Sequence, residues 1–265
     1  MLPNFLIIGA PRCGTTWIQN NLALHPEVYA PSTKELHFFD RHYDNGIDWY
    51  EQQFAGADAP VVGEATPAYL YPEEVPCRIK RHIPDAKLIV SLRDPVERAH
   101  SHFCYRLPEQ RAQGLTLSFE QKLEQSPRLV AESRYAAPLQ RYLDLFPREN
   151  VLVVLHQDIA RRPEALLVDL YAFLGIDVRF RSPLCENKIN MSASRAGRSS
   201  LAYKLSRGLK KYGLPRLSSA LDRLNRRELP GVDATTREKL LYTYFRADIE
   251  DVERLTGRNL AGWKV

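Results

Sequence analysis

Four short apolar runs, each followed by a stretch that can form a helix, constrain the fold of this chain most strongly. The runs cover residues 4–9, 61–64, 87–92 and 151–155 and have the composition of strands buried on both faces. Strands that alternate with helices are typical of βαβ units, in which the strands lie parallel. We therefore predict a doubly wound α/β sheet flanked by helices, followed by a helical C-terminal third. In such sheets, ligands bind at the carboxyl ends of the strands.

Length and cysteine usage narrow the class of protein. The chain has 265 residues and no visible repeat, and we interpret it as one domain over 1–265. Its four cysteines, Cys13, Cys77, Cys104 and Cys185, form no CxxC pair and no zinc-site spacing, which is typical of a reducing compartment. The start of the chain lacks the basic and apolar regions of a signal peptide or membrane span. We therefore expect a cytoplasmic protein without a metal.

The net charge of +5 is concentrated in one block of the sequence. Residues 188–227 contain eleven lysines and arginines against a single acid, Asp222. Within this block, leucines repeat at helical spacing among basic residues, which predicts a basic amphipathic helix. The charge indicates an anionic ligand, while a solvated helical face is the alternative. Peripheral contact with an anionic membrane through 201–227 is a further possible use of this block.

The first predicted strand leads into Gly9-Ala-Pro-Arg-Cys-Gly14-Thr-Thr16, which has the glycine spacing of a P-loop. Backbone N–H groups at the start of a helix and two threonine hydroxyls suit phosphate oxygens. Thr15 stands where NTPases carry the lysine that reaches the β- and γ-phosphates, and Arg12 brings a cation inside the loop instead. The loop thus predicts a P-loop-like 5′-phosphate site and disfavours an ordinary ATPase or kinase.

A second motif follows the strand at 87–92. Arg93 ends this strand, and Asp94 and Pro95 have the residue types of an N-cap and first position of a helix. Ser101 lies about two turns into that helix. The planar guanidinium of Arg93 suits a phosphate, and Ser101 can add a hydroxyl if the junction folds it towards Arg93. A structural Arg–Asp pair is the alternative.

Together, these motifs resemble the sulfotransferase family that uses 3′-phosphoadenosine 5′-phosphosulfate (PAPS), and in particular bacterial members related to the heparan sulfate sulfotransferase domain. The resemblance extends over nearly the whole chain, including 34–40, 63–69, 135–147 and 255–263. It implies transfer of a sulfuryl group from PAPS to a hydroxyl or amine. The acceptor classes left open are carbohydrate, glycolipid and small natural product.

The resemblance also implies which residues bind the donor. It places the 5′-phosphosulfate in the first loop and the 3′-phosphate at Arg93 and Ser101. Arg12 takes the place of the family's usual lysine and is expected to stabilise the departing phosphate. Basic residues beyond the last strand are expected to close over the nucleotide. The full expected set is Arg12, Cys13, Gly14, Thr15, Thr16, Trp17, Arg93, Ser101, Lys188, Arg195 and Arg198.

By the same resemblance, the general base is expected at Glu64, which begins Glu64-Ala-Thr-Pro-Ala-Tyr69. A carboxylate half removed from water at a strand end can have its pKa raised towards neutrality and accept a hydroxyl proton. His37 is the rival base, because histidine fills this role in the family branch that acts on phenols and steroids. Structural roles for Glu64 and His37 are the alternatives.

Two other functions fit parts of the sequence. A nucleotide or nucleoside kinase with a degenerate P-loop is disfavoured by the missing lysine and by the lack of an evident Mg²⁺-binding aspartate at a strand end. A non-catalytic nucleic-acid-binding protein could be built around 188–227, although this block holds few aromatic residues for base stacking. We expect no nucleic-acid partner, and the oligomeric state stays open.

Overall fold

The computed structural model describes residues 1–265 except 116, 187–194, 198–199, 212–213, 225 and 229–230. The chain divides into two compact units. Unit 1 comprises Met1–Arg93, Tyr135–Asn190 and Asp251–Arg258, and unit 2 comprises Asp94–Arg134, Met191–Glu250 and Asn259–Val265. The interpretation of 1–265 as one domain stays a prediction.

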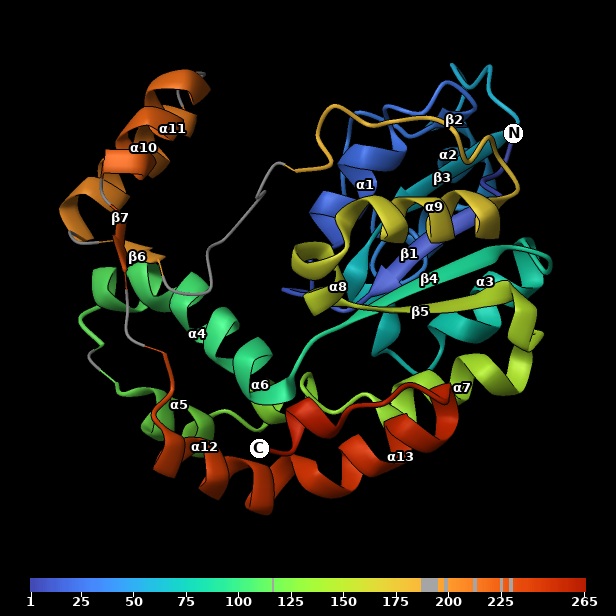
Figure 1. Ribbon diagram of the computed structural model, residues 1–265. Helices are drawn as coiled ribbons and strands as arrows, with labels where there is room; N and C mark the ends of the chain where they lie inside the picture. The colour runs from blue at the N-terminus through green and yellow to red at the C-terminus, as the bar shows by residue number, and fades with distance from the viewer. Residues whose placement is uncertain (116, 187–194, 198–199, 212–213, 225, 229–230) are drawn as a thin grey trace. The chain divides into compact units, whose positions relative to one another are not determined.

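Unit 1 is built on a parallel five-stranded sheet (Figure 1). The strand order is β2 (Val28–Tyr29), β3 (Val61–Ala65), β1 (Phe5–Gly9), β4 (Lys87–Leu92) and β5 (Val151–Leu155). All the neighbouring pairs are parallel, which confirms the predicted doubly wound α/β sheet. Four of the strands coincide closely with the apolar runs, whereas the two-residue β2 was not predicted.

Helices cover both faces of this sheet. Figure 1 shows α1 (Thr15–Leu22) and α9 (Pro163–Leu174) on one side and α3 (Val75–His82) and α7 (Ala136–Leu145) on the other. The apolar cluster under α1 and α9 joins Trp17 and Leu170 to Ile7 and Ile89 of the central strands. The shorter helical elements of unit 1 are α2 (Ile47–Gln52), α8 (His156–Arg161) and the 3₁₀ turns Tyr43–Asn45, Pro67–Leu70 and Arg148–Asn150. The carboxyl ends of β1 and β4 lead into the two predicted phosphate-binding motifs, at Gly9–Thr16 and at Arg93.

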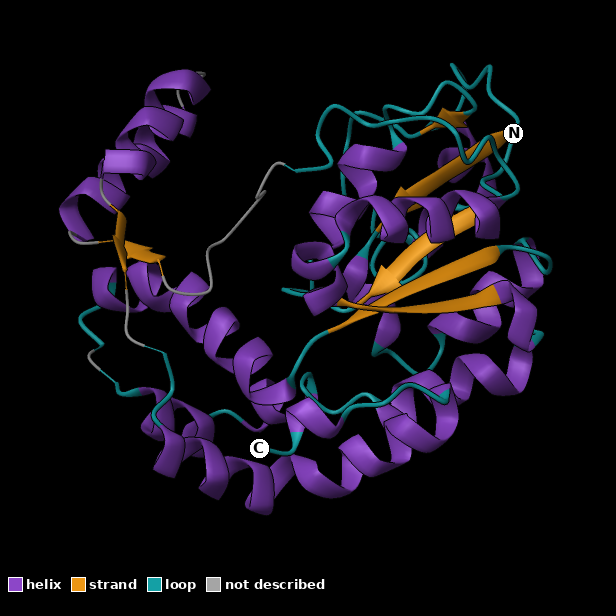
Figure 2. Cartoon of the chain, viewed as in Figure 1, coloured by secondary structure: helices purple, strands orange, loops and turns teal. Residues whose placement is uncertain are grey.

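Unit 2 is mainly helical (Figure 2). Its helices are α4 (Pro95–Ala112), α5 (Phe119–Gln125), α6 (Pro127–Ala131), α10 (Ser200–Lys211), α11 (Pro215–Leu224), α12 (Ala234–Leu240), a π-helical turn (Leu241–Phe245) and the first half of α13 (Arg246–Thr256), and a 3₁₀ turn, Ala261–Trp263, lies near the end of the chain. Among the described residues, none of the helices combines the length and the apolar character needed to cross a bilayer.

The predicted helical C-terminal third needs one correction. Two short strands, β6 (Arg195–Gly197) and β7 (Arg226–Glu228), pair antiparallel within it. Each strand has three residues, which is too short to show the alternating pattern that identifies a strand. The predicted start of α4 is confirmed, because the Glu97 amide donates to Asp94 Oδ1 at 3.0 Å and Pro95 begins the helix.

Candidate active site

The first loop turns from β1 into α1 through a glycine that no other residue can replace without strain. Gly14 is the N-cap of α1 and has a φ of 86°. A Cβ atom at this position would lie 2.3 Å from Ile159 Cδ1 and 3.1 Å from His156 Cδ2. Both the left-handed backbone and the lack of space therefore require glycine here. The contact also shows that His156, the first residue of α8, lies against the loop.

The loop is fastened to the neighbouring strand β4. Ser91 Oγ donates to the Cys13 carbonyl at 2.5 Å, and the Ala10 amide donates to the Ser91 carbonyl at 2.7 Å. Cys13 is buried, as is Trp17, whose indole N–H donates to the Cys185 carbonyl at 3.3 Å. These contacts give Cys13 and Trp17 a part in holding the loop, and their contact with a donor stays a prediction.

A second cation approaches the loop from the segment after β2. Lys34 donates a hydrogen bond to the hydroxyl of Thr16, near the start of α1. Burial, together with the positive charge of Arg12, lowers the pKa of Lys34, while Glu35 opposes this shift. Arg12 itself has a φ of 74°, which is rare outside glycine and is often found where a loop is shaped for a ligand. Lys34 was not among the predicted donor-binding residues.

Arg93 belongs to the same end of the sheet. Burial and the positive charges of Arg93 and Arg12 lower the pKa of His156 to about 4, so this imidazole is uncharged at neutral pH. The Tyr135 hydroxyl donates to the Arg93 carbonyl at 2.9 Å and so fixes the backbone where β4 ends. Arg12, Lys34 and Arg93 thus place positive charge around the N-terminus of α1, an arrangement suited to a polyanionic ligand.

The segment Lys34–Asp40 carries the rival base, His37. Both Glu35 and His37 have positive φ, 60° and 53°. His37 Nδ1 donates to Asp40 Oδ2 at 2.9 Å, and its Nε2 lies 3.7 Å from Glu35 Oε2. The bonds to Asp40 and Glu35 raise the pKa of His37 to about 9. In this geometry His37 pairs with both carboxylates, and its role as the base stays a prediction.

Glu64 lies deeper than expected. Its side chain is at the end of β3, and only 1% of the residue is exposed, whereas the sequence suggested a half-exposed carboxylate. The Tyr50 hydroxyl donates to Glu64 Oε1 at 3.2 Å, and Thr66 Oγ1 donates to Oε2 at 2.7 Å. Burial raises the pKa of Glu64 to about 7 despite these hydrogen bonds.

Glu64 is connected to the Lys34–Asp40 segment through Thr66. The hydroxyl of Thr66 donates to Glu64 and accepts the His37 main-chain amide at 3.3 Å. The same carboxylate therefore anchors the turn that presents Glu35 and His37. Glu35 differs from Glu64 in that 46% of its side chain is exposed, and the bond to His37 is the main cause that lowers its pKa.

The remaining predicted donor-binding residues are Ser101, Lys188, Arg195 and Arg198. Ser101 is a buried residue of α4 in unit 2, and its predicted role beside Arg93 stays a prediction. Lys188 and Arg198 lie outside the described residues. Arg195 belongs to β6, and its side chain is not described.

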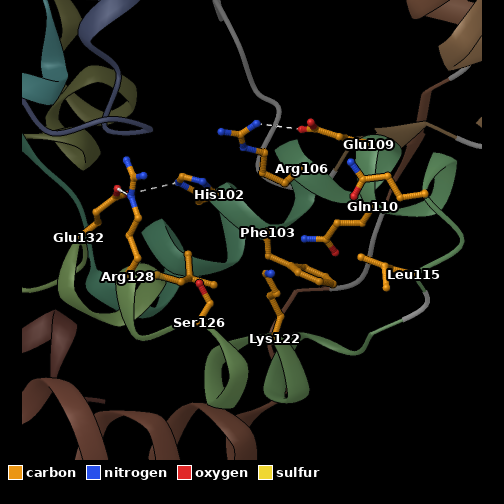
Figure 3. Close-up of a pocket in the computed structure, with 12 residues that line it drawn as sticks. His102, Phe103, Arg106, Glu109, Gln110, Leu115, Lys122, Ser126, Arg128 and Glu132 are labelled. Atoms are coloured by element: carbon orange, nitrogen blue, oxygen red, sulfur yellow. Dashed lines mark hydrogen bonds and ion pairs between the residues drawn. The ribbon is translucent and has the colours of Figure 1, made fainter. Parts of the chain in front are cut away.

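A separate cavity lies within unit 2 (Figure 3). It has a volume of about 270 Å³ and is lined by residues of 102–132, including the ion pairs Arg106–Glu109 and Arg128–Glu132. None of the predicted site residues lines it. Throughout the described part of the chain, the histidine, cysteine and acidic side chains form no group of three or more able to hold a metal ion.

Comparison with known proteins identifies the family. The sulfotransferase domain family matches residues 2–196 of the chain. This chain belongs to the sulfotransferase family. The fold agrees, because a crystal structure of a sulfotransferase from Alicyclobacillus acidocaldarius superposes over 100% of both chains with a TM-score of 0.74 and 28% sequence identity. The family match and the fold therefore agree.

Human relatives of this sulfotransferase are larger proteins. It is 31% identical to bifunctional heparan sulfate N-deacetylase/N-sulfotransferase 3 over an alignment of 195 residues, and the match covers 66% of this chain and 22% of the relative. It is 34% identical to heparan sulfate glucosamine 3-O-sulfotransferase 3B1 over an alignment of 182 residues, and the match covers 66% of this chain and 46% of that relative. The match thus spans about a fifth to a half of the length of these relatives.

Proposed function

We propose that this sulfotransferase moves a sulfuryl group from PAPS to a hydroxyl or amine of a carbohydrate. The observation that carries the proposal is the positive charge of Arg12, Lys34 and Arg93 around the first loop. This loop leads into α1 through its N-cap residue, Gly14. A donor with a 5′-phosphosulfate and a 3′-phosphate is the kind of polyanion that this charge recognises. The names of the human relatives support a carbohydrate acceptor.

The proposed reaction is an in-line displacement at sulfur. The acceptor oxygen or nitrogen forms a bond to sulfur while the bond between sulfur and the phosphate oxygen breaks, and adenosine 3′,5′-bisphosphate leaves. The amides of the first loop, Arg12 and Lys34 stabilise the negative charge that develops on the departing phosphate. The acceptor's proton passes to a carboxylate of the protein. No step of this proposal requires a metal.

Two carboxylates compete to accept that proton. Glu64, the residue predicted from the sequence, has a pKa of about 7, which suits a base, but it is almost fully buried and both its oxygens accept hydrogen bonds. Glu35 is half-exposed and directly follows Lys34, which contacts the first loop. A base must come within hydrogen-bonding distance of the acceptor, so the geometry favours Glu35. Glu64 as the base stays a prediction, and paired variants separate the two.

The function is tested by incubating the protein with PAPS, unsulfated glucosamine–glucuronate oligosaccharides and EDTA. Mass spectrometry should detect oligosaccharides that have gained a sulfuryl group, and Arg12→Ala should reduce this gain. If the product forms only after Mg²⁺ is restored, or if ATP is consumed in place of PAPS, the result supports the kinase alternative and the proposed reaction is wrong.

A further inference from the structure

Helices α10 and α11 form a hairpin whose contact includes small polar residues. Ser206 of α10 and Ser218 of α11 are both buried, and their hydroxyl oxygens lie 2.9 Å apart. Paired amphipathic helices normally bury their large apolar side chains against each other. In this hairpin, serines occupy buried positions where such side chains would be expected.

Leucines lie on the outside of the same hairpin. Leu201 and Leu205, one turn apart on α10, are 75% and 57% exposed, and Leu217 of α11 is 56% exposed. Leu214, which precedes α11, is exposed as well. Of the eleven exposed large apolar side chains among the described residues, these four lie within seventeen positions of each other. Leu201 and Leu205 are four residues apart and therefore share one side of α10, so they form an exposed apolar pair and not two scattered leucines.

The charge beside these leucines indicates what covers them. Lys204 and Arg207 are exposed on α10, and the surrounding block 188–227 carries eleven basic residues against one acid. A second copy of the hairpin would bring two strongly basic blocks together, which is electrostatically unfavourable. Nucleic acid would pair its phosphates with the basic side chains but would leave the leucines exposed to water. An anionic bilayer satisfies both groups, because acyl chains accept the leucines and headgroup phosphates accept the basic side chains.

We propose that the α10–α11 hairpin is a docking surface for anionic lipid bilayers. The leucines enter the boundary between headgroups and acyl chains, and Lys204 and Arg207 extend their charged ends to the phosphates. This binding holds the protein at the membrane surface through the hairpin itself. It is independent of the sulfuryl-transfer proposal, since it requires neither the donor nor an acceptor.

The test is cosedimentation of the full chain with vesicles of phosphatidylcholine alone or mixed with phosphatidylserine. The protein should bind the mixed vesicles and be released as salt is raised. The double variant Leu201→Ser/Leu205→Ser should lose about tenfold or more in affinity, because two apolar side chains no longer enter the bilayer. Lys204→Gln and Arg207→Gln should each lower the affinity about fivefold.

Matched controls use exposed apolar residues outside the hairpin. Leu24→Ser and Tyr242→Ser should bind vesicles like the unaltered protein, and all variants should keep their melting temperature. Equal binding to neutral and anionic vesicles, or full binding by the double leucine variant, would overturn the proposal. A dimer in size-exclusion chromatography that the double variant dissociates would also overturn it and assign the face to a second copy.

Discussion

The hydrogen bond from Lys34 to the hydroxyl of Thr16 brings an ammonium from a distant segment to the start of α1. In the sequence of the first loop, Thr15 stands at the position of the P-loop lysine. The structure supplies a lysine from a different part of the chain, between β2 and β3. The lysine that is missing from the loop itself is therefore present beside it.

Replacing Lys34 by alanine should weaken binding of adenosine 3′,5′-bisphosphate by about 1.5–3 kcal/mol, the usual contribution of a hydrogen bond to a charged group. Isothermal titration calorimetry measures this change. Lys239→Ala, which removes an exposed lysine of α12, is the control and should bind normally. Unchanged affinity in Lys34→Ala would show that this ammonium has no part in donor binding.

Arg93 should discriminate between nucleotides with and without a 3′-phosphate. We expect the protein to bind adenosine 3′,5′-bisphosphate much more tightly than adenosine 5′-phosphate, and Arg93→Ala should remove most of this difference. Ser101→Ala tests the second predicted contact in the same titration. If the unaltered protein binds both nucleotides equally, the 3′-phosphate assignment is wrong.

Replacing Glu35 or Glu64 by glutamine should affect turnover to different extents. Glu35→Gln should lower turnover by about 10²–10⁴-fold with little change in nucleotide affinity, because the glutamine cannot accept the acceptor's proton. Glu64→Gln should keep more activity, and its loss should come with a shifted melting temperature, since this residue anchors the turn. The opposite ranking, at unchanged melting temperatures, would make Glu64 the base. His37→Gln tests the rival histidine in the same assay.

Glu64 should also give the protein a distinct dependence of stability on pH. Its pKa is about 7 in the folded state against 4.5 for an ordinary glutamate in water, so the folded state holds this proton more tightly. The free energy of unfolding should therefore fall as the pH rises from about 4.5 to about 7 and stay level above, by on the order of 3 kcal/mol. Denaturant unfolding of Glu64→Gln at pH 5 and pH 8 should lack this part of the change. Equal pH dependence in both proteins would contradict the raised pKa.

His156 should couple donor binding to proton uptake. Its pKa is about 4 because it is buried and because Arg12 and Arg93 repel the imidazolium. Phosphates bound at those arginines would offset this repulsion and raise the pKa of His156, so binding should take up protons below about pH 6. Calorimetry in buffers of different ionisation enthalpy measures the uptake, and His156→Asn should abolish it. Identical heats in all buffers for the unaltered protein would exclude the coupling.

Local sequence patterns predicted the framework of the site well. The strands and the cap at Asp94 were visible because apolar runs and capping residues act over a few positions. The role of Gly14 at the start of α1 could be predicted because a P-loop-like turn has a short, fixed spacing, and phosphate binding by Arg12 stays a prediction. The three-residue strands β6 and β7 were missed because their pairing depends on contacts between segments far apart in the sequence.

The side chains around the candidate base depend on long-range structure. Lys34 reaches Thr16, and Thr66 joins Glu64 to His37, through contacts that no local pattern encodes. Tyr50 and Thr66 both donate hydrogen bonds to the buried carboxylate of Glu64. The sequence could therefore place Glu64 at a strand end but could not predict how little of its side chain is exposed. The positive φ of Glu35 was equally hidden, because glycine usually marks such positions.

The two bonds between Ser91 and the first loop have a consequence for the speed of nucleotide capture. They are made within the protein, so the loop's shape does not depend on a ligand to form it. A nucleotide that binds a preformed loop is not delayed by a slow rearrangement of that loop. Its association rate is then governed by diffusion and by attraction to the surrounding cations, and it should fall as ionic strength rises.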